Sequence, residues 1–158
     1  MIRMRTFSKA YGMAGARVGY ALGQEELIRS FDKIRNHFGM CRISQAGALA
    51  ALKDQRYLRS VVEEVANARQ RIGRIASEQG LEVVPSATNF VAIDCAQDGD
   101  FARSVLAELV ARDIFVRMPF VAPQDRCIRV SAGQRTDLDL LALQLPLALE
   151  AASQNRSS

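Results

Sequence analysis

One short segment near the start of the chain carries the residues best suited to covalent chemistry. Lys9 follows a hydroxyl residue, Ser8, and Arg17 comes eight residues later, within a stretch 12–19 that contains three glycines. A lysine amine can attack a carbonyl carbon and form an imine when burial or nearby cations free its lone pair. Arg17 would supply such a field and could bind an anion together with Ser8, while the glycines allow the backbone to approach a ligand closely. A solvated surface lysine in a glycine-containing loop is the alternative that composition alone leaves open.

Two other kinds of site are not supported by the sequence. Lys9 precedes the glycines and no Gly-Lys-Ser/Thr motif is present, so a P-loop is excluded. The three cysteines have no CxxC spacing and His37 is the only histidine, so we expect reduced thiols and no metal site. We expect His37 to be a helix cap or a surface residue, with a place at a substrate entrance as the alternative.

Composition narrows the class of protein. Hydrophobic residues make up 49% and charged residues 24% of the 158 residues, as in ordinary globular proteins. The net charge of +4 arises from basic residues that alternate with acidic ones, so no nucleic-acid surface is expected. No apolar run approaches the ~20 residues that cross a bilayer, and no signal peptide is evident. We therefore expect a cytoplasmic protein that does not bind a membrane.

The hydrophobic pattern indicates the elements that must position the lysine segment. A strand at 2–7, a loop at 8–15 and a short buried strand at 17–22 surround Lys9. Helical spacing follows, with a helix from 24 to about 35, a second helix capped by Ser44 that ends near 54, and a long helix at 57–79 closed by Gly80.

The rest of the chain has the pattern of a small α+β domain. We expect strands at 81–84, 89–94, 114–117 and 127–131, a helix at 100–112, and a last helix from Thr136 to Leu149 that Pro146 kinks. Helices on one face of an antiparallel or mixed sheet would satisfy this order. The first segment instead resembles the edge of a larger domain, because it places a loop rich in chemistry between two strands at one end of the chain.

The lysine segment also resembles a known family. Ser8-Lys9-x-x-Gly12-x-x-Gly15-x-Arg17-x-Gly19-Tyr20 is similar to the pyridoxal-phosphate attachment signature of class I/II aminotransferases of fold type I, and RTFSKAYGMAGARVGY is most similar to their histidinol-phosphate branch. SATNF at 86–90, IFVR at 114–117 and CIRVSAG at 127–133 match in the same order, so the resemblance covers nearly the whole chain.

The resemblance implies an α/β fold. It predicts the end of the large pyridoxal-phosphate transferase domain at 1–36, a helical connection at 37–79, the small C-terminal α+β domain at 80–150 and a disordered tail at 151–158.

The resemblance implies a role for each matching residue near Lys9. Lys9 would be the Schiff-base lysine and would shuttle a proton between the substrate and pyridoxal 5′-phosphate. Ser8 and Arg17 would bind the phosphate of the cofactor.

Three further residues match the substrate side of the family site. Arg129 would grip the substrate carboxylate, and its position between Ile128 and Val130 on a strand suits a fixed clamp. Arg117 would meet a substrate phosphate, and Asn89 would line the same side. A surface arginine at a strand end and a turn residue remain the alternatives for Arg117 and Asn89.

Two hypotheses about function follow. The first is a transaminase that moves an amino group between an amino acid and a 2-oxo acid, with histidinol phosphate and 2-oxoglutarate as the leading pair and a homodimer as the full-length assembly. The second is a non-catalytic remnant or partner-dependent subunit. The chain corresponds to roughly the last two-fifths of such an enzyme, so the residues that hold the cofactor ring would lie before Met1. We therefore expect a truncated product, a fragment of a split gene or a domain that needs a partner.

Overall fold

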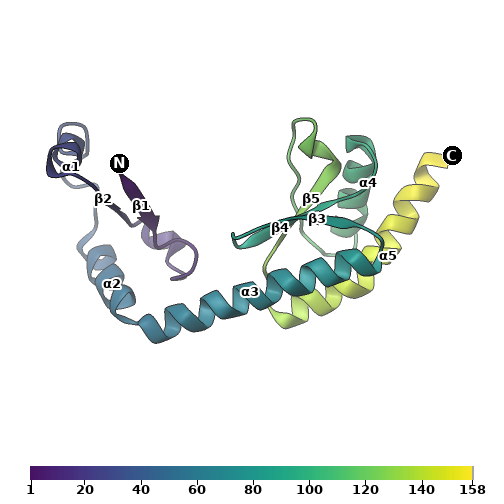
Figure 1. Ribbon diagram of the computed structural model, residues 1–158, viewed down its shortest axis with the longest axis horizontal. Helices are drawn as coiled ribbons and strands as arrows, with labels where there is room; N and C mark the ends of the chain where they lie inside the picture. The colour runs from purple at the N-terminus through teal and green to yellow at the C-terminus, as the bar shows by residue number, and fades with distance from the viewer. Residues whose placement is uncertain (158) are drawn as a thin grey trace. The chain divides into compact units, whose positions relative to one another are not determined.

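The computed structural model describes residues 1–157. These residues form two compact units, and the boundary between them in the sequence falls between Glu63 and Glu64. Both α-helices and β-strands are present, as the sequence predicted (Figure 1). The elements are β1 (Arg3–Thr6), the 3-10 helix η1 (Ala14–Ala16), β2 (Gly19–Leu22), α1 (Glu25–Phe31), α2 (Arg42–Lys53), α3 (Gln55–Glu78), β3 (Glu82–Val84), β4 (Phe90–Asp94), α4 (Gly99–Val110), the 3-10 helix η2 (Gln124–Arg126), β5 (Cys127–Ser131) and α5 (Arg135–Ser157).

The first unit is built around an antiparallel ribbon of β1 and β2. Thr6 pairs with Gly19 and Arg3 with Leu22, so residues 7–18 form the long loop of a hairpin. The expected strand at 17–22 is confirmed over Gly19–Leu22, but the expectation that it is buried is wrong: Leu22 is 56% exposed. Most side chains of this ribbon are exposed, because two paired strands alone bury little surface.

The helices of the first unit differ from expectation at their ends. The helix expected to reach 35 ends at Phe31, where the amide of Asp32 donates to the carbonyl of Arg29 in a tighter turn. Helix α2 begins at Arg42, so Ser44 lies within it and does not cap it. Asp54 instead caps the next helix, α3, because its side chain accepts from the backbone amide of Tyr57 at 3.0 Å.

The long helix ends as the sequence predicts. Helix α3 stops at Glu78, and Gly80 has a φ of +70°, the left-handed conformation that glycine adopts without strain. The amide of Leu81 then donates to the carbonyl of Ala76 at 3.0 Å, which satisfies one of the last helical carbonyls.

The second unit contains an antiparallel sheet of order β3-β4-β5 with helices against one face. Along β4 burial alternates, and in β5 Ile128 and Val130 are buried on the same face, with Cys127 buried as well; Val91 opposes Val130 while Ile93 opposes Ile128. The core lies between this face and α3, α4 and α5 (Figure 1), and fully buried side chains contribute about 1.5–3 kcal/mol each. Its largest fully buried members are Ile72, Ile93, Leu109, Ile128, Leu141, Leu145 and Val105.

One expected strand is absent from the second unit as the structure describes it. Residues 114–117 form no strand, and only Arg117 makes an isolated antiparallel bridge to Arg129. The backbone of Asp113 turns through a φ of +61°, and Phe115 is 76% exposed, so the segment meets β5 at a single residue.

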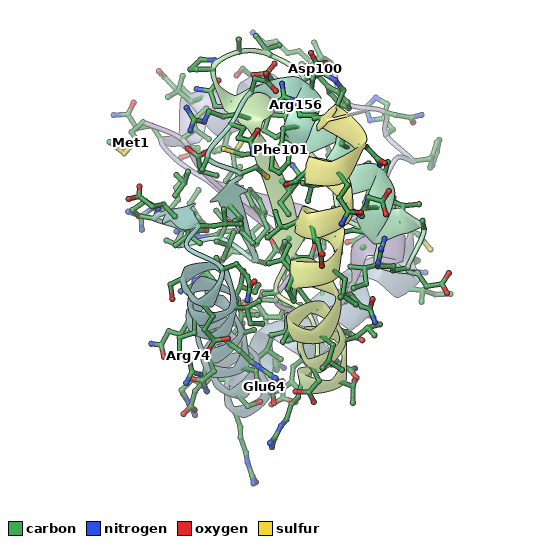
Figure 2. The ribbon with its side chains drawn as sticks, turned by 90° about the vertical axis from the view of Figure 1, so that its right-hand side faces the viewer. Met1, Glu64, Arg74, Asp100, Phe101 and Arg156 are labelled. Atoms are coloured by element: carbon green, nitrogen blue, oxygen red, sulfur yellow. The ribbon has the colours of Figure 1, made fainter. Side chains whose placement is uncertain are left out.

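Helix α5 is longer than expected. Pro146 does not end it, and it continues to Ser157, so the expectation of a disordered tail is wrong for residues 151–157; Ser158 lies outside the described residues. Arg156 holds this end of the helix, because its guanidinium pairs with the Asp98 carboxylate at 2.5 Å and lies 6.0 Å from the centre of the Phe101 ring (Figure 2). Tertiary contacts therefore stabilise the turns that follow the proline.

Candidate active site

The loop that carries Lys9 is closed at its base by two backbone hydrogen bonds. The amide of Phe7 donates to the carbonyl of Val18 at 3.2 Å, and the amide of Met13 donates to the carbonyl of Phe7 at 3.0 Å. The Phe7 side chain is 3% exposed and packs against the rings of Tyr11 and Tyr20, with centroids 4.6 and 5.8 Å away. A buried aromatic ring thus anchors an otherwise exposed loop.

Lys9 lies in the first turn of this loop. The amide of Gly12 donates to the Lys9 carbonyl at 2.8 Å, and Gly12 has a φ of +67°. The Lys9 side chain is exposed, and among the residues that the structure describes its ammonium has no hydrogen bond or ion pair. A backbone hydrogen bond therefore fixes the turn, and the Lys9 amine remains unpaired among the described residues.

Ser8 is oriented by a residue that the sequence did not single out. The Thr6 hydroxyl donates to the Ser8 hydroxyl at 2.9 Å and accepts from the Ser8 amide at 3.0 Å. Because Ser8 accepts from Thr6, its own hydroxyl proton is free to donate to an anion. The sequence did contain a signal for this contact, because Thr6 and Ser8 are hydroxyl residues two positions apart just before Lys9.

Arg17 occupies an unusual backbone conformation. Its φ of 50° and ψ of 47° lie in the left-handed region, which costs an L-residue about 1–2 kcal/mol. One guanidinium nitrogen, Nη1, donates to the Ala14 carbonyl at 2.7 Å. The guanidinium is held by one of its five donors, and the others remain for a ligand. Strand β2, which follows, requires glycine at its first position, since a Cβ at Gly19 would lie 2.7 Å from the Arg5 carbonyl oxygen.

Two of the three substrate-side residues predicted from the sequence meet at one edge of the sheet in the second unit. The amide of Arg117 donates to the Arg129 carbonyl at 3.2 Å, and the Arg129 amide donates back to Arg117. Asn89 lies farther along, because its carbonyl accepts at 2.9 Å from the amide of Ala132, three residues after Arg129, while Arg129 itself pairs with Ala92. The structure therefore brings Arg117 and Arg129 into direct contact and does not place Asn89 against them.

The two arginines share the sheet face opposite the core. Ile128 and Val130 are buried, so Arg129 between them points to the other face, as the sequence predicted. Directly opposed residues of antiparallel strands place their side chains on the same face. The Arg129 guanidinium lies 4.9 Å from the Phe90 ring centre and that of Arg117 lies 5.7 Å from the Phe115 ring centre. Within residues 1–157 neither guanidinium has an acidic partner, and the pair can bind two oxyanion groups.

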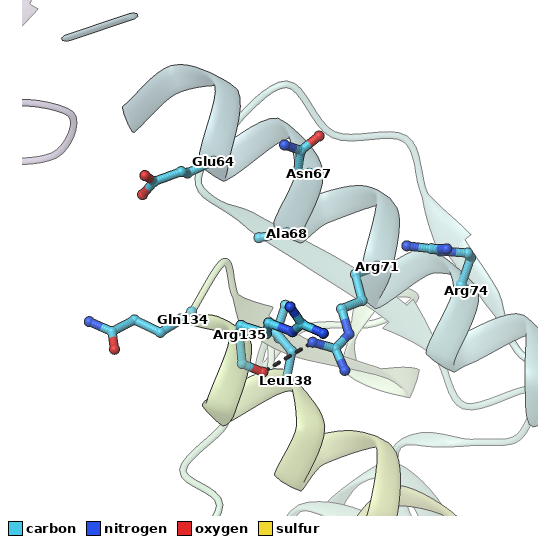
Figure 3. A pocket seen from close by; sticks show the side chains of 9 residues that line it. Glu64, Asn67, Ala68, Arg71, Arg74, Gln134, Arg135 and Leu138 are labelled. Carbon is cyan, nitrogen blue, oxygen red and sulfur yellow. Dashed lines mark hydrogen bonds between the residues drawn. The ribbon is translucent and has the colours of Figure 1, made fainter. Parts of the chain in front are cut away.

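The structure also shows two cavities that the sequence did not reveal. In the first unit, exposed His37 lines a cavity of about 430 Å³ together with Phe7, Tyr20 and Gln45. In the second unit a cavity of about 660 Å³ lies between α3 and the start of α5 (Figure 3). We call it the arginine cavity, and it is lined by Glu64, Asn67, Ala68, Arg71, Arg74, Gly133, Gln134, Arg135 and Leu138. Its two walls are more than 60 positions apart in sequence, which explains why no local pattern indicated it.

The described part of the chain offers neither a metal-binding cluster nor a membrane-spanning helix. Residues 1–157 contain no group of three His, Cys, Asp or Glu side chains placed to hold a metal ion. Over the same residues, every helix is too short or too polar to cross a bilayer.

Comparison with known proteins relates this chain to one family. A family model for class I and II aminotransferases matches residues 1–145. Histidinol-phosphate aminotransferase of Geobacillus thermodenitrificans is 39% identical over 139 residues, which cover 88% of this chain and 37% of that protein. The Bacillus subtilis histidinol-phosphate aminotransferase is 44% identical over 105 residues, covering 66% of this chain and 29% of that protein.

A solved structure agrees with these sequence matches. The crystal structure of histidinol-phosphate aminotransferase from Sinorhizobium meliloti in complex with pyridoxal-5′-phosphate is 56% identical, with a TM-score of 0.90 over 94% of this chain and 41% of that chain. The chain therefore spans about two-fifths of the length of the relatives that it matches.

Proposed function

The chain belongs to the class I and II aminotransferase family, and from this premise we propose that it carries the catalytic amine and the substrate-anion site of a pyridoxal-phosphate-dependent transaminase. One observation carries the proposal: a turn fixed by backbone hydrogen bonds presents the unpaired amine of Lys9, and the residue before it, Ser8, has its hydroxyl oriented by Thr6. The solved relative from Sinorhizobium meliloti, which holds pyridoxal-5′-phosphate, supports the assignment of the cofactor.

The groups on the lysine loop fit an aldehyde that carries a phosphate. Lys9 offers the amine, Ser8 offers a free hydroxyl proton, and Arg17 offers guanidinium donors that point from a backbone held in one conformation. When bound, pyridoxal phosphate supplies an aldehyde carbon for the amine and an electron-withdrawing ring. Ser8 and Arg17 would bind the phosphate, and this would hold the aldehyde end near Lys9.

Lys9 would serve twice in this proposal. Its amine would be the nucleophile toward a carbonyl carbon, with the carbonyl oxygen leaving as water, and the free amine would hold at Nζ a proton that it can deliver to, or take from, a substrate carbon. A lysine can do both because its amine is a nucleophile and a base at the same atom. The hydrogen bond from Gly12 to the Lys9 carbonyl keeps the main chain in place while the flexible side chain moves.

The arginine pair would select substrates for their negative charge. Arg129 lies within a strand and would bind the carboxylate of an amino acid or a 2-oxo acid. Arg117 would bind a substrate phosphate or a second carboxylate. A dicarboxylic 2-oxo acid would engage both arginines through its two carboxylates, whereas histidinol phosphate has no carboxylate and would bind through its single phosphate. Histidinol phosphate and 2-oxoglutarate are the proposed pair, and the names of the relatives support the first of them.

Transamination is proposed to require the rest of the family fold. The chain covers 41% of the solved relative, and the β1–β2 ribbon leaves apolar side chains such as Met4 and Leu22 exposed. Polypeptide that covers this ribbon would also have to bind the cofactor ring. Formation of a Lys9 adduct needs only the loop, whereas turnover needs the complete site.

The test is reduction of the chain with borohydride in the presence of pyridoxal phosphate, followed by peptide mass spectrometry. The chain has three lysines, Lys9, Lys33 and Lys53, so the label can be assigned to each. We expect a visible absorbance and a label that concentrates on Lys9 and disappears in Lys9→Ala. Lys33→Ala, which removes another exposed lysine from the first unit, should leave both unchanged. Equal labelling of the three lysines would refute the proposal.

A further inference from the structure

We propose that the arginine cavity is a second anion site, separate from the Arg117 and Arg129 pair, that binds a small phosphate ester. The cavity lies wholly within the second unit, and three guanidinium groups from two helices line it. Arg71 and Arg74 come from α3, and Arg135 is the first residue of α5.

Arg71 is the fixed member of the three. Figure 3 shows it reaching from α3 to the start of α5, where Nη1 donates to the Arg135 carbonyl oxygen at 3.1 Å. Nη2 pairs with the Asp139 carboxylate, and the side chain is 27% exposed. These contacts hold the planar fork in one orientation, which reduces the entropy lost when a ligand binds.

The other two arginines are available to a ligand. In the described part of the chain, the guanidinium groups of Arg74 and Arg135 have neither a hydrogen bond nor an ion pair. Glu64 is the single acidic residue among those that line the cavity within residues 1–157. Asp139 neutralises Arg71, so the positive charge that attracts an anion comes from the two free guanidinium groups of Arg74 and Arg135, which match the oxygens of a doubly charged phosphate.

The remaining lining suits an organic phosphate better than a free ion. Asn67 and Gln134 add neutral hydrogen-bonding groups, and Ala68 and Leu138 add apolar surface. A volume of about 660 Å³ is far larger than one phosphate ion and lies in the range of small-molecule sites. In the described part of the chain the Asp137 carboxylate forms no ion pair with these arginines, and it accepts from the backbone amide of Gln134 at 3.0 Å.

The test is a titration of the chain with inorganic phosphate at constant ionic strength, adjusted with chloride and followed by the backbone amide signals of Gly133 and Arg135. The titration is made in an Arg117→Gln/Arg129→Gln background, so that the proposed substrate site contributes nothing. We expect saturable shifts, weakened about tenfold by Arg74→Gln or Arg135→Gln, as expected for loss of one charge-assisted hydrogen bond. Arg59→Gln removes the same charge from an exposed site elsewhere on α3 and should leave the half-saturation point unchanged.

The outcomes separate this proposal from the proposed function. Shifts that fail to saturate, or that respond equally to Arg59→Gln, would identify an adventitious ion only and overturn the second site. A circular dichroism melt of each variant confirms that an unresponsive protein is folded. Labelling of Lys9 by pyridoxal phosphate is measured independently, so either proposal can fail alone. If phosphate binds, a weaker response to phenyl phosphate than to phosphate would overturn the assignment to an ester.

Discussion

Arg117 and Arg129 lie directly opposite each other on antiparallel backbone, and each amide donates to the carbonyl of the other residue. Like charges in this relationship destabilise a sheet by roughly 0.2–1 kcal/mol. Phe90 and Phe115 lie beneath the two guanidinium groups and offset part of that cost. We propose that the two arginines lie opposite each other in order to bind an anionic ligand, which would neutralise both charges.

Loss of Arg117 is expected to discriminate between substrates. In an assembly that transaminates, Arg117→Ala should lower kcat/KM for a phosphorylated amino acid by about 100-fold, since one or two charge-assisted hydrogen bonds are lost. The kcat/KM for an unphosphorylated amino acid should fall by less than about threefold. Steady-state kinetics with the two substrates provide the measurement. An equal loss for both would show that Arg117 does not recognise the phosphate.

The lysine loop is expected to depend on one buried ring. Phe7→Ala should destabilise the first unit by about 3–5 kcal/mol, because Phe7 is one of its three buried hydrophobic residues and the cavity cannot be filled. Hydrogen exchange of the peptide that spans 7–18 should accelerate, while β4 and β5 stay protected. Phe38→Ala is the matched control, because Phe38 is 94% exposed. Equal acceleration by both variants would contradict the anchoring role.

The backbone strain at Arg17 can be separated from its proposed phosphate contact. Arg17→Gly should be about 1 kcal/mol more stable than Arg17→Ala, because glycine adopts a φ of 50° without a Cβ clash. Both variants lose the guanidinium and should bind pyridoxal phosphate equally weakly. Denaturant unfolding and an absorbance titration measure the two effects. A tighter complex with the glycine variant would mean that backbone conformation, and not the guanidinium, controls binding.

The buried thiol of Cys95 is expected to be unreactive and to make stability depend on alkaline pH. Burial raises the pKa of Cys95 from 9.0 to about 11, and burial also raises the pKa of Cys127. A disulfide reagent at pH 8 should therefore modify exposed Cys41 first, and the two buried cysteines only on unfolding. The unfolded chain releases the Cys95 proton near pH 9 and the folded chain near pH 11. Between these values the unfolded state binds fewer protons, so the free energy of unfolding falls as pH rises, by about 2–3 kcal/mol in all.

The control for Cys95 is a variant that lacks the thiol. Cys95→Ala keeps the other groups that titrate above pH 9, so its unfolding free energy should fall less steeply over the same window. Urea unfolding at pH 8 and pH 10.5 gives the comparison. Parallel curves for the two proteins would exclude a linkage to Cys95.

Local patterns in the sequence determined much of the fold. Alternation along 127–131 places Ile128 and Val130 in the core and Arg129 on the opposite face, and the structure confirms both. The end of the long helix at Gly80 is likewise confirmed, because a left-handed φ has a strong residue preference. The family motif around Lys9 could also be identified from the sequence, because all of its residues lie close together in the chain.

The features that only the tertiary structure decided all depend on residues far apart in the chain. Arg156 and Asp98 stabilise α5 as far as Ser157, although the sequence pattern predicted a helix that Pro146 kinks and that ends at Leu149. Residues 114–117 have the composition of a strand, yet they find a partner only where Arg117 meets Arg129. The arginine cavity exists because α3 and the start of α5 meet across 64 positions at the Arg71 hydrogen bond. Sequence periodicity reports which face of an element is apolar, and packing decides which distant polar groups then share a site.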